Sequence, residues 1–193
     1  MLAILFIIFS FVQQARSQAL TYKMTALGKN IGTMKVYKNS KNGFVYYYTR
    51  TDLDVNLLVK RVKLSSINNT IYKNQALYKS DVTVEVNGNN HSSSHLHWDG
   101  NQYQVKLDGK SANPISSLVN MSGTLLNFQE PKDIQTSFSE ASGQFITIKK
   151  KKEGVYETID PGNDRKMRYY YTKGVLTKME VKHPLLTITL SLQ

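Results

Sequence analysis

The chain has 193 residues, no cysteine, and 25 lysines and arginines against 14 aspartates and glutamates, a formal net charge of +11. This length suffices for one domain with a hydrophobic core, and the lack of cysteine excludes disulfides, thiol catalysis and cysteine-ligated zinc. Twenty of the basic residues are lysine and five are arginine. Because bidentate recognition of phosphates and bases favours arginine, we expect no nucleic-acid partner.

The N-terminal segment predicts export. Leu2–Val12 is a run of eleven residues that are all apolar except Ser10. This is shorter than the roughly 20 residues that cross a bilayer and is typical of a secretory signal peptide. Small residues favour a cut before Gln18, which divides the chain into a signal peptide (1–17) and a single mature domain (18–193); a cut after residue 19 is the alternative. We expect a periplasmic or extracellular protein without a transmembrane helix.

The rest of the chain alternates apolar and polar residues with a period of two, which predicts β-strands. The clearest rows are Leu20–Ala26, Met34–Val36, Val82–Val86, Val175–Val181 and Leu186–Leu192. Pairs such as Asn87-Gly88 and Asp108-Gly109 separate the rows, and such pairs favour tight hairpin turns. The sequence therefore predicts an all-β fold, a single antiparallel meander of roughly 10–14 strands that is closed or nearly closed into a barrel.

One segment departs from this alternation. Pro114 follows an asparagine, and the apolar residues Ile115, Leu118 and Val119 recur at the spacing of a helix face. Asparagine is a good N-cap and proline is tolerated in the first helical turn. These features predict one short helix near residues 114–121.

Two aromatic runs, Phe44–Tyr48 and Tyr169–Tyr171, place rings on both faces of a strand. Either a bulge changes the register there, or both faces are covered by the fold, a lid or a partner. A barrel of more than eight strands also has room inside for a ligand. The candidate residues for binding a ligand or a partner are Tyr46, Tyr47, Tyr48, Trp98, Tyr169, Tyr170 and Tyr171.

Three histidines, His91, His95 and His97, share one face of a predicted strand. Imidazoles at this spacing are candidate ligands for zinc or copper. Leu96 and Trp98 occupy the opposite face, however, which places the histidines in solvent if the apolar face is buried. A metal site and a solvated row are therefore alternative interpretations.

The chain carries no nucleophile elbow and no phosphate-binding glycine loop, so the sequence indicates no catalytic residue and no cofactor. We expect a non-enzymatic envelope protein that binds an apolar, amphipathic or lipid-like ligand, or a partner protein of the envelope. One alternative is a metal-dependent or hydrolase-like enzyme that uses His91, His95 and His97. Another is a small outer-membrane β-barrel, although its strands need about 9–11 residues and several rows here are shorter.

Several short motifs follow one another along the chain. They are Leu27-Gly28-Lys29, His97-Trp98-Asp99-Gly100, Asp108-Gly109-Lys110, Phe128-Gln129-Glu130-Pro131 and Phe138-Ser139-Glu140-x-x-Gly143. Their order and spacing resemble a domain-of-unknown-function family of exported β-rich proteins from Gram-negative bacteria. More distantly, the chain is similar to periplasmic large-barrel proteins of unknown function. The resemblance implies an architecture and a compartment, and no catalytic residue.

Overall fold

The computed structural model describes residues 17–57, 60–160, 166–183 and 186–193. These residues form one 3-10 helix, η1 (Leu125–Asn127), and fourteen strands. The strands are β1 (Gln18–Ala26), β2 (Lys29–Lys41), β3 (Phe44–Leu57), β4 (Lys60–Lys73), β5 (Ala76–Val86), β6 (Asn89–Trp98), β7 (Tyr103–Leu107), β8 (Lys110–Ile115), β9 (Thr136–Ser139), β10 (Gln144–Lys152), β11 (Val155–Ile159), β12 (Lys166–Thr172), β13 (Val175–His183) and β14 (Leu186–Leu192).

The predicted signal peptide falls on residues that lie outside the described part of the chain, apart from its last position. β1 begins at Gln18, directly after the predicted cut. Export stays a prediction. No helix within the described ranges is long and apolar enough to cross a membrane.

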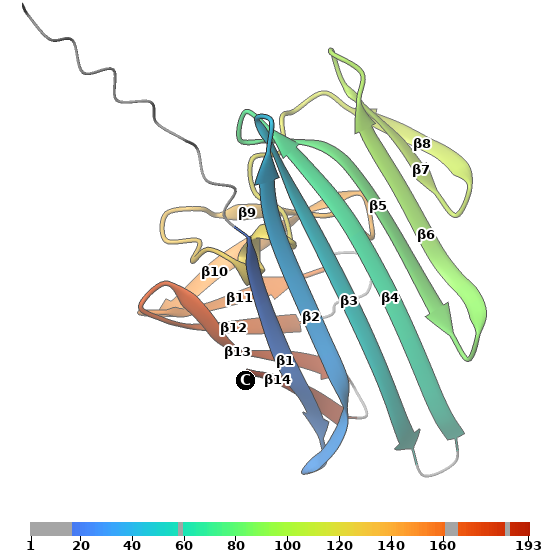
Figure 1. Ribbon diagram of the computed structural model, residues 1–193, viewed down its shortest axis with the longest axis vertical. Coiled ribbons are helices and arrows are strands. Elements are labelled where there is room, and N and C mark those ends of the chain that lie inside the picture. The colour runs from blue at the N-terminus through green and yellow to red at the C-terminus, as the bar shows by residue number, and fades with distance from the viewer. Residues whose placement is uncertain (1–16, 58–59, 161–165, 184–185) are drawn as a thin grey trace, which may run out of the picture.

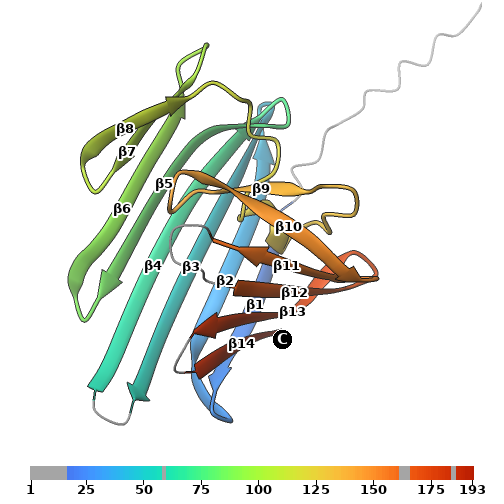
Figure 2. The same ribbon diagram turned by 180° about the vertical axis from the view of Figure 1, so that it is seen from behind.

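All fourteen strands belong to one antiparallel sheet, which confirms the predicted all-β meander. Strands that follow each other in sequence are neighbours in the sheet, except β8 and β9. The first and last strands, β1 and β14, pair with each other and so join two runs of strands. We call β1–β8 the N-terminal half and β9–β14 the C-terminal half. The sheet folds back on itself, so that β10–β14 cross behind β1–β3 at a steep angle (Figures 1 and 2). Each half therefore covers the inner face of the other.

The core lies between these two inner faces, where the alternating apolar rows meet. Tyr22 and Met24 of β1 face inward beside Met34 and Val36 of β2, and none of these side chains is more than 6% exposed. The C-terminal half adds the largest buried side chains that face them. They include Phe138, Ile148, Tyr156, Tyr169, Tyr171, Leu176, Met179 and Leu190. A period of two predicted these inward rows because it matches the pleat of a strand.

The hairpin turns follow the predicted Asn-Gly and Asp-Gly chemistry. Asn87 and Gly88 have φ angles of 53° and 81°, and Asp108 and Gly109 have 50° and 76°. Two successive residues with positive φ define the type I′ turn, whose twist matches that of the strands on either side. These turns explain why neighbouring strands pair directly.

The sheet does not close, so the predicted barrel is wrong. Its edges are β8 and β9, and these two strands do not pair with each other. β9 has only four residues, and its free edge is already occupied, because the Phe138 amide donates to Met121 O and the Gly123 amide donates to Phe138 O. The segment that takes this position is residues 116–135, between β8 and β9, which we call the crossing segment.

The predicted helix at 114–121 is also wrong. Pro114 lies in β8, the edge strand, where a residue without an N–H costs no ladder hydrogen bond. The following residues are extended rather than helical, since their backbone pairs with other strands: the Leu77 amide donates to Val119 O, and Met121 pairs with β9 as described. Tertiary pairing outweighs the local helical spacing, and one turn of 3-10 helix forms later, at Leu125–Asn127.

The buried tyrosines predict a loss of stability in alkali. Burial raises the pKa of Tyr22 and of Tyr169 to about 12, and burial with a bond to Glu130 does the same for Tyr156. In the unfolded chain tyrosine ionises near pH 10. Between about pH 10 and 12 the unfolded state therefore holds fewer protons than the folded state, and the free energy of unfolding falls as the pH rises.

Urea unfolding at several alkaline pH values, with ultraviolet absorbance to follow phenolate formation, measures this effect. Tyr22→Phe removes one of the three phenols and is expected to give a shallower decline. A free energy of unfolding that stays constant over this pH range would contradict the expectation.

Candidate functional site

Pockets of ≈ 230 to ≈ 520 Å³ open at several places on the described part of the molecule, and one of them lies between the two halves of the sheet. Its volume is ≈ 230 Å³. The N-terminal half, the crossing segment, the β9–β10 turn and the C-terminal half all contribute to its walls. The lining residues are Met34, Thr49, Ser66, Asn68, Val82, Gly123, Thr124, Asn127, Ser139, Glu140, Ala141, Ile146, Met167, Tyr169 and Met179. We call it the interior pocket.

One wall of the interior pocket is polar although it belongs to the inner face of the sheet. On β4, Ser66, Asn68 and Thr70 share the face of the core residue Tyr72, as the pairing of β3, β4 and β5 shows. Across the ladder, Thr70 lies opposite Ser80 of β5. Buried polar groups need hydrogen-bond partners, and these residues find them on the crossing segment.

The crossing segment is tied to this wall by side-chain hydrogen bonds. The Asn68 amide donates to Thr124 Oγ1 over 2.9 Å, and Thr70 Oγ1 donates to Asn68 Oδ1 over 2.7 Å. The Tyr72 hydroxyl donates to Ser122 Oγ over 2.8 Å. Because Ser122 is fully buried and Thr124 is 3% exposed, these bonds form in the interior.

Glu140, in the turn between β9 and β10, is the charged member of this network. Its Oε1 atom accepts a bond from Ser122 Oγ at 2.6 Å and one from the Thr124 amide at 3.0 Å. Its backbone carbonyl accepts from Ser94 Oγ of β6. The side chain is 4% exposed. The crossing segment thereby holds the carboxyl group, and the N-terminal half holds the backbone of the same residue.

The negative charge of Glu140 acts on the buried phenols around it. Burial raises the pKa of Tyr72, and the charge of Glu140 is the second cause. Burial also raises the pKa of Tyr169 to about 12, with a smaller contribution of the same sign from Glu140. Both phenols therefore stay protonated near neutral pH.

The second carboxyl oxygen of Glu140, Oε2, belongs to a residue that lines the interior pocket. Oε2 has no hydrogen-bond partner among the described residues, and it is not one of the fully enclosed atoms without a partner. Gly123 lies beside it: a Cβ atom at that position would be 3.1 Å from Oε2. The absence of a side chain at Gly123 thus leaves space around this oxygen.

The opposite wall of the pocket is apolar. Met167 of β12, Met179 of β13 and Ile146 of β10 line it from the C-terminal half, and Met34 of β2 and Val82 of β5 add apolar side chains beside the polar wall. Methionine is flexible and polarisable, and it adapts to differently shaped apolar groups. The interior pocket therefore joins an adaptable apolar wall to a hydrogen-bonding wall that ends in a carboxylate.

The structure separates the aromatic residues that the sequence singled out. Tyr169 lines the interior pocket, and Tyr47 and Tyr171 are core residues at 7% exposure. Trp98 packs partly buried against the core, with its ring centroid 4.8 Å from that of Tyr103. The remaining three, Tyr46, Tyr48 and Tyr170, lie on the outer face of the sheet. The seven residues do not form one site.

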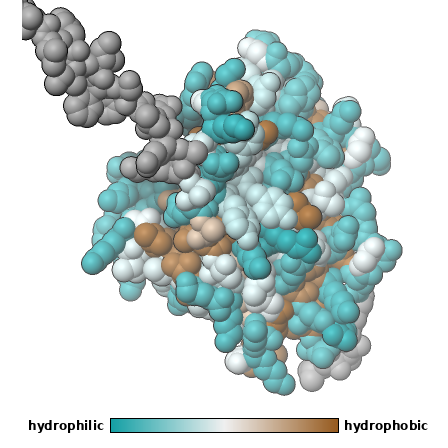
Figure 3. All heavy atoms as spheres, viewed as in Figure 1, coloured by the Kyte–Doolittle hydropathy of each residue, from teal (hydrophilic) through white to brown (hydrophobic). Residues whose placement is uncertain are grey.

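The outer aromatic rings are accompanied by lysines. Tyr37 and Tyr46 are 43% and 41% exposed, and Lys73 Nζ lies 5.3 Å from the centroid of Phe44. On the C-terminal half, Lys178 Nζ lies 3.9 Å from the centroid of Tyr170. Figure 3 shows that the face in view is mostly hydrophilic, with apolar side chains in separate groups. Aromatic residues on both faces of a strand are thus explained by a core side and a lysine-covered outer side.

The histidines of β6 are exposed and stay apart from the pocket. His95 and His97 lie on the outer face, opposite Asp81 and Lys79 respectively. His95 Nδ1 lies 2.8 Å from Asp81 Oδ1. His91 is at an irregularity in the β5–β6 pairing. No group of three or more histidine, aspartate or glutamate side chains in the described part of the chain is arranged to hold a metal ion.

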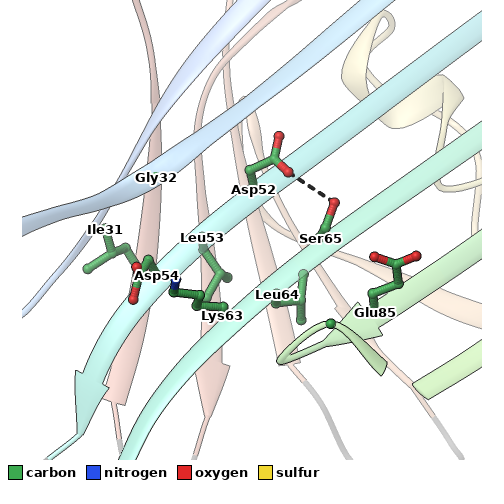
Figure 4. A pocket seen from close by; sticks show the side chains of 10 residues that line it. Ile31, Gly32, Asp52, Leu53, Asp54, Lys63, Leu64, Ser65 and Glu85 are labelled. Atoms are coloured by element: carbon green, nitrogen blue, oxygen red, sulfur yellow. Dashed lines mark hydrogen bonds between the residues drawn. The ribbon is translucent and has the colours of Figure 1, made fainter. Parts of the chain in front are cut away.

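A second hollow, of ≈ 330 Å³, lies over β2–β5 near the turn between β3 and β4 (Figure 4). Asp52, Asp54 and Glu85 contribute carboxylates to it. Arg50 and Arg61 already pair with the first two at 2.7 Å and 2.6 Å, and these bonds lower the pKa of both aspartates. The side chains of these two ion pairs are 40% exposed or more. This hollow is therefore a solvated surface whose two aspartates already have partners, unlike the interior pocket.

Sequence reasoning missed the central residues of the interior pocket, Glu140, Ser122 and Thr124. Glu140 occurs in a motif between two strands, where a charged residue is ordinarily solvated. One signal was present on β4: Ser66, Asn68 and Thr70 share the parity of Tyr72, while isoleucines take the other. In a strand with this pattern, the polar residues face inward if Tyr72 does, and the isoleucines then face outward.

The fold and its pocket define an open, folded antiparallel sheet with a polar site in its core. The chain belongs to a family described as a domain of unknown function (DUF6134), whose model matches residues 22–193. That match includes every strand except the first residues of β1. No curated protein and no solved structure matches the chain.

Proposed function

We propose that this protein binds a small amphipathic ligand in the interior pocket. The observation that carries the proposal is the combination of a methionine wall with a buried carboxylate oxygen that lacks a partner in the described chain. Ligand sites in proteins are typically concave, mostly apolar and supplied with a few fixed polar groups. The apolar wall would take the hydrocarbon part of the ligand, and the polar wall its head group.

The pocket limits the size of the ligand. At about 30 Å³ for each water-sized group, ≈ 230 Å³ holds about eight non-hydrogen atoms. A neutral probe close to this size is 1-octanol, whose hydroxyl head and eight-carbon tail make nine non-hydrogen atoms. Ligand-observed NMR and calorimetry measure its binding to the mature protein.

Filling the pocket tests its assignment. Ser66→Phe puts a ring into the interior pocket from β4 and is expected to weaken octanol binding at least tenfold. Ile67→Phe adds a ring at the next position of the same strand, on the outer face, and is expected to leave binding unchanged. Thermal unfolding of both variants checks that each is folded. Equal octanol affinity in the two variants, or no binding to the unmodified protein, would contradict the proposal.

A further inference from the structure

Glu140 is a buried charge without an opposite charge. Its side chain is 4% exposed, and none of the ion pairs formed by the described residues includes it. Of the described residues that line the interior pocket, it is also the only charged one. Buried charges in proteins are usually paired, because hydrogen bonds alone compensate only part of the lost hydration.

The existing hydrogen bonds leave one side of the carboxylate open. Ser122 and the Thr124 amide both donate to Oε1, and no donor for Oε2 is found in the described ranges of the chain. The two bonds fix the orientation of the group, and Glu140 is among the residues that line the pocket. Gly123 keeps the space beside Oε2 free of a side chain.

The other groups around the pocket do not supply a cation. Its polar lining consists of hydroxyl and amide side chains, such as Thr49, Ser66 and Asn127, and the phenol of Tyr169. Hydroxyls and amides of this kind fit a neutral or a charged head group equally. The carboxylate is the one feature that discriminates, since a cationic donor forms a charge-assisted bond with it and an anion is repelled.

We propose that the ligand of the interior pocket carries a cationic ammonium head group, which pairs with Oε2 of Glu140 while its apolar tail packs on Met34, Met167 and Met179. This inference rests on the proposed binding function and names the chemical class of the ligand. The ligand is an alkylamine of about eight non-hydrogen atoms, or the amine-bearing end of a larger amphiphile, in a pocket of this volume.

Three probes with the same tail and different heads test the inference: octylammonium, 1-octanol and octanoate. Calorimetry at neutral pH with the mature protein is expected to show octylammonium binding at least tenfold more tightly than octanol. Octanoate is expected to bind at least tenfold more weakly than octanol. This series needs no variant, so it does not depend on how the protein tolerates substitution.

A pair of charge-removing variants assigns the preference to one residue. Glu140→Gln keeps an acceptor for Ser122 and Thr124 and removes the charge, so octylammonium and octanol are expected to bind it with similar affinity. Glu85→Gln removes an exposed carboxylate on the outer face, and the preference for octylammonium is expected to persist.

The outcomes separate the two proposals. If octanol binds but octylammonium binds no better, the head-group inference is overturned and the pocket proposal stands. If the preference survives in Glu140→Gln, the cation is recognised elsewhere and the inference is also overturned. If none of the three probes binds, the pocket proposal itself fails, and the inference fails with it.

Discussion

Replacing Ser122 by alanine is expected to lower the free energy of unfolding by about 3 kcal/mol. The change removes one hydroxyl, but that hydroxyl is the acceptor for Tyr72 and a donor to Glu140. All three groups are buried, with exposures of 0%, 3% and 4%. After the substitution the Tyr72 hydroxyl has no acceptor and the carboxylate loses one of its two donors. Urea unfolding monitored by circular dichroism measures the difference.

Ser137→Ala is the matched control for this prediction. Ser137 of β9 is as buried as Ser122, at 0% exposure, but its hydroxyl has no hydrogen-bond partner. Removing it leaves no group unsatisfied, and we expect a change of less than about 1 kcal/mol. Equal losses in the two variants would mean that the hydrogen bonds of Ser122 do not hold the crossing segment in place.

Gly32→Ala is expected to lower the free energy of unfolding by about 4 kcal/mol, an unusually large effect for the addition of one methyl group. A Cβ atom at Gly32 would lie 2.1 Å from the backbone oxygen of Asp52 and 2.8 Å from Cα of Leu53. Both atoms belong to the backbone of β3, which cannot move aside without breaking its pairing with β2 and β4. Glycine in a strand marks this kind of close backbone approach.

Gly88→Ala distinguishes the collision from a general effect of glycine. Gly88 has a φ angle of 81°, which is unfavourable for alanine, but a Cβ atom there would meet nothing within 4 Å. We therefore expect a cost of about 1 kcal/mol, from the backbone conformation alone. A Gly32→Ala protein as stable as Gly88→Ala would show that β2 and β3 are not in this close contact.

The strands and turns were predictable because their signals are local. Rows such as Leu186–Leu192 alternate with the pleat of the strand, and turns such as Asn87-Gly88 need only their own backbone angles. Around Val55 and Val62 the apolar residues change from one parity to the other. The structure has β3 and β4 paired in continuous register, with Val55 opposite Val62, so a hairpin separates the two rows.

The sequence could not predict that the sheet stays open or that residues 114–121 are extended, because both depend on where the crossing segment lies. Ile115, Leu118 and Val119 have helical spacing, but the backbone carbonyl of Val119 is taken by Leu77 of β5. The same segment covers β9 at Phe138 and so prevents closure. No local pattern indicates pairing between residues this far apart in the sequence.

The candidate site was only partly predictable. Tyr169 was among the residues expected to bind, and it lines the interior pocket. Glu140 belongs to a turn motif between two strands, where a glutamate ordinarily faces water, so the sequence did not indicate that it is buried. Its burial follows from the fold of the sheet as a whole, which brings the β9–β10 turn against Ser94 of β6 and the crossing segment against Oε1.

The most direct test of ligand binding in the interior pocket uses the methionine methyl groups of the protein as reporters. Met34, Met167 and Met179 line the interior pocket, whereas Met24 and Met121 are core residues outside its lining, at 4% and 5% exposure. Octylammonium is titrated into protein with ¹³C-labelled methionine methyl groups. Binding in the interior pocket predicts saturable chemical-shift changes for the three pocket methionines, with the signals of Met24 and Met121 nearly unchanged. Unchanged pocket signals, or equal shifts for all five methionines, would contradict binding in the interior pocket.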